Sequence, residues 1–131
     1  MIISTIHTLI PTNLQTVWNT VTSLNDYGWR SDLKNIEVHS SSSFTEYTNS
    51  NVPTLFTITL FKPFCRYEFD MKNENFIGHW TGVFRETANG TEIIFTETIT
   101  IKKWWLRPFA KIYIKKQQRR YIADLKKQCL K

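Results

Sequence analysis

The chain has 131 residues, of which 41% are hydrophobic and 15% aromatic, and a formal net charge of +6 at pH 7. This length corresponds to one domain that can bury a core without disulfides or a metal. No run of 18 apolar residues is present, which excludes a predicted membrane span. The first ten residues lack the features of a signal peptide. We therefore expect a single domain, residues 1–131, in the cytoplasm, with Cys65 and Cys129 as free thiols.

The elements follow from hydrophobic periodicity and turn residues, taken along the chain. Residues 2–10 predict a strand, and PTNLQTVWNTVTSLN predicts a helix with Thr12 and Gln15 at capping-box spacing. After a polar loop, further strands are expected at residues 34–39, 44–48, 55–61, 66–72, 76–86 and 91–101. The breaks between them, such as SSSS, NSNVP and ANG, are rich in turn residues. Short turns between consecutive strands predict an antiparallel meander with one apolar face.

Residues 104–131 predict a long amphipathic helix, because they contain no Gly and their only proline, Pro108, can occupy a first turn. At 100° per residue, the predicted inward face carries Leu106, Ala110, Tyr113, Ile114, Gln117, Tyr121 and Leu125. This helix would cover the apolar face of the sheet.

The positive charge is concentrated in this last segment. Residues 102–131 hold eleven of the 17 Lys and Arg residues and one acid, Asp124. Such a surface can be a solvated outer face, or it can contact anionic headgroups or an acidic protein. Trp104 and Trp105, next to basic residues, suit a membrane surface. No nucleic-acid motif accompanies the charge, so we expect no nucleic-acid partner.

The final hairpin sets which residues of its two strands lie opposite each other. A two-residue Asn89-Gly90 turn places Gly82 opposite Glu97 and Trp80 opposite Ile99. A four-residue loop instead brings Trp80 opposite Glu97 on the same face. Only a three-residue loop or a bulge would exchange the two faces.

The preceding hairpin indicates the same apolar face. A turn at Asn73-Glu74 places Tyr67 opposite Trp80. The face shared by both hairpins carries Tyr67, Phe69, Met71, Phe76, Trp80, Phe84, Phe95 and Ile99. Gly78 and Gly82 interrupt it, which indicates a bulge, a bend or the close approach of another group. We expect these two positions to leave room for a cavity.

Glu97 places a carboxyl group in the middle of this apolar face, within the stretch IIFTETITI. Three interpretations stay open. It can be turned outward or paired with a basic or tyrosine side chain at a rim, it can be a polar anchor in a ligand cavity, or it can act as a general acid or base. Inside and unpaired, its pKa would be raised by desolvation.

The order of elements resembles a known family. The stretches IPTNLQTVWNTVTSLNDYGWR, FIGHWTGVFRETANGTEIIFTETI and QQRRYIADLKK are similar to the START-like superfamily, in its bacterial polyketide cyclase/dehydrase-like (SRPBCC) branch. The resemblance covers essentially the whole chain. It implies an α+β helix-grip fold, in which a curved antiparallel sheet of about six to seven strands wraps around the C-terminal helix and encloses a cavity. Members bind lipids, sterols, polyketides or quinones, some cyclise or dehydrate their ligand, and no shared catalytic residue can be carried over.

We therefore expect a hydrophobic or amphipathic ligand, such as a lipid, polyketide or quinone-like molecule, between the sheet and the helix. The alternative is a non-enzymatic module whose basic helix contacts an anionic membrane or an acidic protein. The candidate ligand-binding residues are Trp29, Tyr67, Phe69, Trp80, Gly82, Phe84, Phe95, Glu97, Tyr113, Gln117 and Tyr121. No cofactor is expected, and the scattered His7, His39 and His79 predict no metal site.

Overall fold

The computed structural model describes residues 1–49 and 52–131. Within these residues, seven antiparallel strands form one sheet in the order β1-β7-β6-β5-β4-β3-β2. The strands are β1 (Ile2–Ile10), β2 (Leu33–Ser40), β3 (Ser43–Thr48), β4 (Thr54–Lys62), β5 (Arg66–Lys72), β6 (Phe76–Thr87) and β7 (Gly90–Ile101). The helices are α1 (Leu14–Thr22), the short 3-10 helix η1 (Trp104–Leu106) and α2 (Arg107–Cys129). The turn expected at NSNVP includes residues 50 and 51, which lie outside the described residues.

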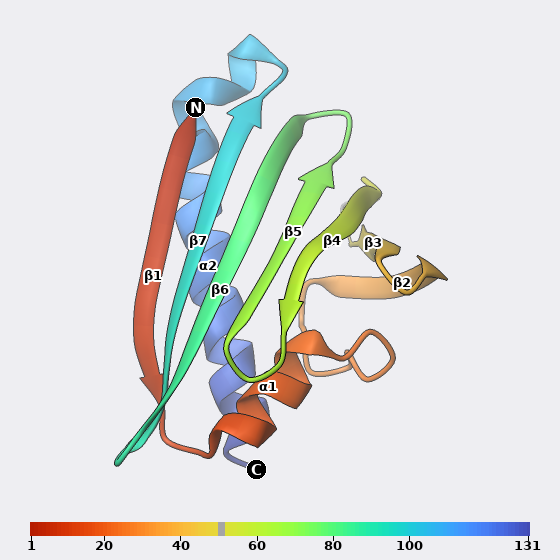
Figure 1. Ribbon diagram of the computed structural model, residues 1–131. Coiled ribbons are helices and arrows are strands. Elements are labelled where there is room, and N and C mark those ends of the chain that lie inside the picture. Colours follow the sequence, from red (N-terminus) through yellow and green to blue (C-terminus); the bar gives the residue numbers. More distant parts are fainter. Residues whose placement is uncertain (50–51) are drawn as a thin grey trace.

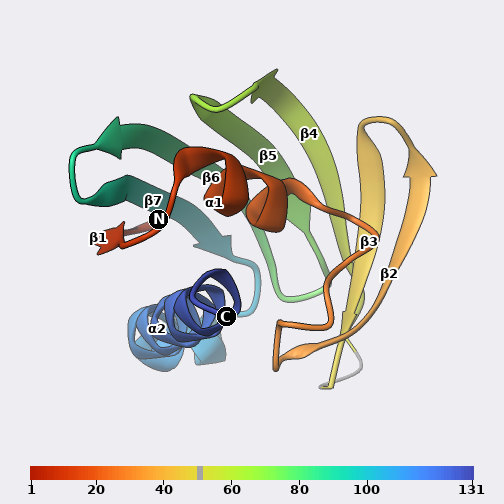
Figure 2. The same ribbon diagram turned by 90° about the horizontal axis from the view of Figure 1, so that it is seen from below.

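The sheet curves around the C-terminal helix (Figure 1). Seen along the helix in Figure 2, the strands form an arc, with α2 beneath the end that contains β1 and β7 and with α1 beneath the middle. The predicted α+β helix-grip arrangement is therefore confirmed. No helix in the described part of the chain is long and apolar enough to cross a membrane.

Helix α1 begins one residue later than the predicted capping box requires. The side chain of Asn13, not that of Thr12, accepts the capping hydrogen bond, from the backbone N–H of Thr16 at 2.8 Å. The backbone carbonyl of Thr12 accepts a hydrogen bond from the hydroxyl of the buried Thr91, at 2.9 Å. The helix buries Trp18, whose ring packs edge-on against Phe84 with centroids 4.8 Å apart. This contact holds α1 against the sheet.

The last hairpin differs by two residues from the register of the predicted Asn89-Gly90 turn. Thr87 lies opposite Gly90, so Trp80 lies opposite Glu97 and not opposite Ile99. Gly90 takes a φ of 138°, and a Cβ there would overlap the carbonyl oxygen of Ile10. The hairpin therefore turns through residues 88–89, which lets this glycine pack against the end of β1.

The preceding hairpin is shifted by two residues as well, with Phe69 rather than Tyr67 opposite Trp80. A shift of two keeps every side chain on its face of the sheet. The predicted apolar face is confirmed, since all eight of its residues belong to the core cluster or pack against it. The sequence pattern thus predicts the face correctly. In the last hairpin the observed pairing of Trp80 with Glu97 is the one expected for a longer loop, and in the preceding hairpin the predicted pairing is wrong.

The spaces beside Gly78 and Gly82 are filled, contrary to expectation. A Cβ added at Gly82 would overlap the ring of Trp80, and one added at Gly78 would lie 2.5 Å from Cδ1 of Ile99. The register on both sides of β6 is continuous, so neither glycine marks a bulge. Both glycines allow the close approach of a neighbouring side chain, and neither opens a cavity.

Replacing Gly82 with alanine should lower the free energy of unfolding by about 1–3 kcal/mol, because the new methyl group displaces the packed Trp80 ring. Urea denaturation measures this change. Gly28→Ala is the matched control: no heavy atom lies within 4 Å of the position that its new methyl group would take, so stability should change by less than about 1 kcal/mol. Equal effects of the two substitutions would contradict the packing seen at Gly82.

A candidate ligand cavity between the sheet and the C-terminal helix

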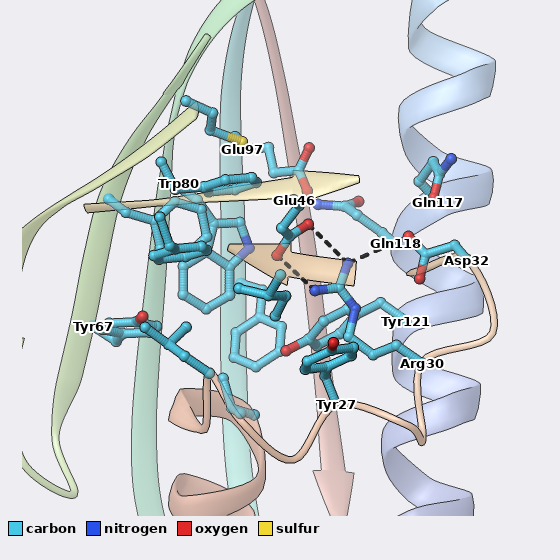
Figure 3. A pocket seen from close by; sticks show the side chains of 18 of the residues that line it. Tyr27, Arg30, Asp32, Glu46, Tyr67, Trp80, Glu97, Gln117, Gln118 and Tyr121 are labelled. Atoms are coloured by element: carbon cyan, nitrogen blue, oxygen red, sulfur yellow. Dashed lines mark hydrogen bonds and ion pairs between the residues drawn. The ribbon is translucent and has the colours of Figure 1, made fainter. Parts of the chain in front are cut away.

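A cavity of about 140 Å³ lies between the concave face of the sheet, α2 and the loop of residues 23–32 that joins α1 to β2 (Figure 3). Nine aromatic residues line it: Tyr27, Trp29, Phe44, Phe56, Tyr67, Phe69, Trp80, Phe95 and Tyr121. Its polar lining includes Tyr27, Arg30, Asp32, Glu46, Glu97, Gln117 and Gln118. Aromatic walls with a few placed polar groups are typical of small-molecule sites.

Most of the predicted ligand-binding residues reach this cavity. Those that line it are Trp29, Tyr67, Phe69, Trp80, Phe95, Glu97, Gln117 and Tyr121. Gly82 and Phe84 lie in the adjacent core instead, where the Trp80 ring covers Gly82 and Phe84 packs against Trp18. Whether the lining residues contact a ligand stays a prediction.

Tyr113 does not share the inward face of α2, which corrects the expectation. Its side chain is 58% exposed, and its hydroxyl accepts a hydrogen bond from Nε2 of Gln117 at 2.8 Å. The buried residues of α2 are Ala110, Ile114, Gln118, Ile122, Leu125 and Cys129. The helix is therefore rotated so that Tyr113 faces outward and Gln118, which is not among the predicted site residues, faces inward.

Glu97 reaches the cavity from the centre of the sheet. Its cross-strand neighbours are Trp80 on β6 and Ser4 on β1. The Ser4 hydroxyl is already used, since it donates to Oε1 of Gln118 at 2.7 Å. Figure 3 shows the Glu97 carboxyl on the cavity side of the sheet, and among the described residues none forms a hydrogen bond or ion pair with it. The outward-facing interpretation of Glu97 is therefore wrong.

Burial raises the pKa of Glu97 from 4.5 to about 7. The low-polarity surroundings disfavour the carboxylate, and no described cation compensates it. Near neutral pH the group therefore exists as a mixture of the acid and the carboxylate. It can donate a hydrogen bond to a bound molecule in the first form and bind a cation in the second.

The raised pKa makes stability depend on pH. The folded state holds the Glu97 proton to higher pH than the unfolded state does, so stability falls as the pH rises from about 4.5 to about 7. The Glu97→Gln variant has no carboxyl group at this position, so it does not lose stability in this way as the pH rises. Its advantage in unfolding free energy over the unmodified protein should grow by about 3 kcal/mol between pH 4.5 and pH 8. Urea denaturation at several pH values measures the difference.

Glu92→Gln, on the convex face of the same strand, is the control for this pH dependence. A hydrogen bond from His7 lowers the pKa of Glu92, so its removal should shift the pH dependence in the opposite direction. A pH-independent difference between Glu97→Gln and the unmodified protein would show that the carboxyl is not held in a desolvated site.

A buried ion-pair cluster forms the opposite wall of the cavity. The Arg30 guanidinium donates two hydrogen bonds to the Glu46 carboxylate, at 2.7 and 3.2 Å, and a third to Asp32 at 3.3 Å. It also lies over the ring of Tyr121, 5.3 Å from the centroid. Burial alone would lower the pKa of Arg30, but the pairing with Glu46 outweighs it and raises the pKa. The guanidinium is therefore permanently charged. Its two terminal nitrogens are occupied by Glu46 and Asp32, whereas its buried Nε has no hydrogen-bond partner among the described residues.

This cluster is absent from the predicted site residues. Alternation in FTEYT places Glu46 on the same face as Phe44, which is an available signal of an inward carboxyl. Arg30, however, belongs to a loop, and its direction depends on how that loop lies against α2. The backbone N–H and hydroxyl of Ser31 both donate to Asp124 on α2, at 2.9 and 2.7 Å. The single acid of the basic segment thus positions the loop.

Comparison with known proteins identifies the fold. No family model matches the sequence, and no curated protein does. Among solved structures, the chain is similar to a START superfamily protein from Mycobacterium smegmatis, with a TM-score of 0.86, 8% identity, and 97% of this chain and 96% of that chain covered. It is also similar to a protein from Thermus thermophilus, with a TM-score of 0.84, 15% identity, and 98% and 97% covered.

A conserved protein from Geobacillus kaustophilus gives a TM-score of 0.83 at 10% identity, with 98% of this chain and 93% of that chain covered. At identities this low the likeness concerns the fold alone. The curved seven-stranded sheet and the helix it surrounds match these structures over nearly their whole length. The chain shares the helix-grip fold of these structures, one of which is a START superfamily protein.

Proposed function

We propose that the protein binds a small, largely apolar molecule with one polar group in the cavity between the sheet and α2. The observation that carries the proposal is the unpartnered Glu97 carboxyl facing an aromatic-lined cavity. Buried polar groups are normally hydrogen-bonded. A ligand that brings the missing partner would complete the site. The START fold supports small-molecule binding in general, because it encloses space under the helix.

The cavity volume limits the size of this ligand. An apolar cavity of about 150 Å³ holds one benzene molecule, and the present cavity is about 140 Å³. Pockets for drug-sized ligands measure about 300–1,000 Å³. A molecule of one ring or a short chain therefore fits without rearrangement. A lipid, a polyketide or a substituted quinone would require the loop of residues 23–32 to move away from α2.

Titration with 2-phenylethanol tests the proposal, using calorimetry and NMR shifts of the tryptophan indole N–H groups. We expect saturable binding, with the largest shifts at Trp29 and Trp80, which line the cavity. Val21→Phe fills the cavity from α1 and should abolish binding. Val38→Phe makes the same change on a half-exposed side chain outside the cavity and should leave binding intact. Equal binding by both variants would place the probe elsewhere and overturn the proposal.

Chemistry of the cyclase or dehydrase type would add a proton transfer to the bound molecule. The pKa of Glu97 is suited to such a transfer, because general acids and bases work best when their pKa lies near the ambient pH. Binding is needed in either case. Loss of turnover in Glu97→Gln with retained binding is the result that would add catalysis to the proposed function.

A second candidate function is contact with an anionic membrane, through the outer face of α2 and η1. Four apolar side chains there are more than half exposed: Trp104, Trp105, Phe109 and Ile112. The following turns of the same face carry Lys116, Arg119 and Arg120, all exposed. An apolar surface rich in tryptophan beside basic residues is suited to the interface of an anionic bilayer. The free thiols of Cys65 and Cys129 support a cytoplasmic location.

Flotation with vesicles containing phosphatidylserine tests this second candidate. Reversing Lys116, Arg119 and Arg120 to glutamate should abolish flotation. Reversing Lys34, Lys62 and Lys72, which are exposed outside this face, gives the same change in net charge and should leave most of the binding intact. Equal losses in the two triple variants would show nonspecific charge attraction, and binding to an acidic protein without flotation would contradict the membrane assignment.

A further inference from the structure

The side chains that line the cavity include more acidic groups than basic groups. One guanidinium, that of Arg30, stands against three carboxyl groups, those of Asp32, Glu46 and Glu97. Arg30 is held by Glu46 through two hydrogen bonds and by Asp32 through a third. No lysine or histidine is among the lining residues. Within the described part of the chain, the cavity therefore offers Glu97 no positive partner.

The groups packed around Glu97 from each element do not supply a cation either. Ser4 on β1 donates to Gln118 on α2, and the Gln118 amide donates to the backbone carbonyl of Ser4 at 2.9 Å. Lys115 on α2 donates to the carbonyl of Thr5 at 2.7 Å and lies 3.4 Å from Oε1 of Gln118. These groups satisfy one another, so a counter-charge for the ionised form of Glu97 would have to come with the ligand.

The aromatic side chains near Glu97 favour a positively charged ligand as well. Trp80 lies directly across the strands from Glu97, and its ring centroid is 4.7 Å from that of Phe95 and 4.8 Å from that of Phe69. These rings pack against one another and make the surroundings of Glu97 apolar, which strengthens the attraction between a carboxylate and an ammonium group.

We propose that the cavity selects a small apolar amine, whose ammonium group donates hydrogen bonds to the Glu97 carboxylate while its apolar part lies among the aromatic side chains. This inference rests on the proposed function, because it specifies the polar group of the ligand bound there. The cavity volume of about 140 Å³ limits the apolar part to roughly one ring.

Calorimetric titration with 2-phenylethylamine and its neutral counterpart 2-phenylethanol tests the inference. At pH 8 the amine should bind at least about tenfold more tightly than the alcohol, because its hydrogen bonds are charge-assisted. Lowering the pH to 6 should weaken amine binding by about tenfold, following the ionised fraction of a carboxyl with a pKa of about 7. The alcohol should show no such loss. An alkylamine, like that of lysine, stays protonated over this range.

The effect of Glu97 on amine binding can be distinguished from that of other groups that titrate. Burial raises the pKa of Tyr67 to about 12 and also raises that of Tyr121, so both stay neutral between pH 6 and 8. The pKa of His79 is raised as well: burial lowers it, but hydrogen bonds to Asp70 and Glu68 outweigh that effect, and the ring lies on the opposite face of the sheet. A pH effect on amine binding that persists in Glu97→Gln would therefore come from a group other than Glu97 and would overturn the inference.

Substitution separates the two proposals. Glu97→Gln should lose the preference for the amine and keep the alcohol, whereas Glu92→Gln on the convex face of the same strand should keep both. Equal affinity of the unmodified protein for amine and alcohol at pH 8 would overturn the amine inference and leave the cavity proposal standing. Binding of neither probe would overturn both. The pH series on the unmodified protein gives the answer even if Glu97→Gln does not fold.

Discussion

Replacing Trp80 with alanine is expected to lower the free energy of unfolding by about 4 kcal/mol, within the range for buried aromatic side chains truncated to alanine. The ring is 7% exposed and stacks on Phe69 with an interplanar angle of 6°. The ring also covers Gly82, so its removal leaves two neighbouring positions of the same face with no side-chain atom beyond Cβ. Urea denaturation measures the loss. The cavity would then extend into the space of the indole ring.

The enlarged cavity provides a second readout for Trp80→Ala. Indole should raise the melting temperature of this variant more than that of the unmodified protein, because it fits the space that the substitution opens. Trp105→Ala is the control: its ring is 54% exposed at the start of the C-terminal helical segment, so truncation should change stability by less than about 0.5 kcal/mol. A similar small effect at Trp80, or no response to indole, would contradict the packing described for the cavity wall.

Arg30→Met is expected to destabilise the protein by about 3–5 kcal/mol, because it leaves the carboxylates of Glu46 and Asp32 without their cation. The side chains of the Arg30–Glu46 pair are only 15% and 11% exposed, so water does not replace the lost partner. Adding Glu46→Leu should recover most of the lost stability, since a buried pair replaced as a whole by apolar groups costs little.

Arg85→Met is the matched control for Arg30→Met. Arg85 also pairs with a glutamate, Glu92, but its side chain is 70% exposed, and pairs at such positions contribute about 0–1 kcal/mol. Comparable losses in the two variants would show that the Arg30 cluster is solvated and does not form a dry wall of the cavity.

The strands and the long helix that covers their apolar face could be predicted because they depend on local patterns, whereas the helix-grip arrangement followed from the resemblance to the START-like superfamily. Alternation in residues 93–101 and helical periodicity in residues 104–131 determine which element forms and which face is buried. The pairing of the strands could not be predicted in the same way, because registers that differ by two residues bury the same side chains. Gly90, whose backbone packs against Ile10, selects between these registers.

The rotation of α2 was ambiguous for a similar reason. Its first turns carry apolar residues on both sides, with Ile114 buried and Ile112 exposed, so periodicity alone gave Tyr113 the wrong face. Glu97 could be identified because a charge on an apolar strand face stands out. The Arg30 cluster could not, because it joins a loop residue to a strand through contacts that only the folded loop creates.

A crystal structure of the protein with 2-phenylethanol tests the central claim most directly. We expect electron density for one aromatic ring between Trp80, Phe95 and Tyr121. The alcohol oxygen should lie about 2.7 Å from a carboxyl oxygen of Glu97, the usual distance for such a hydrogen bond. A cavity filled by repacked side chains at a saturating concentration of the alcohol, with the probe absent or bound only at the surface, would contradict the proposed binding site.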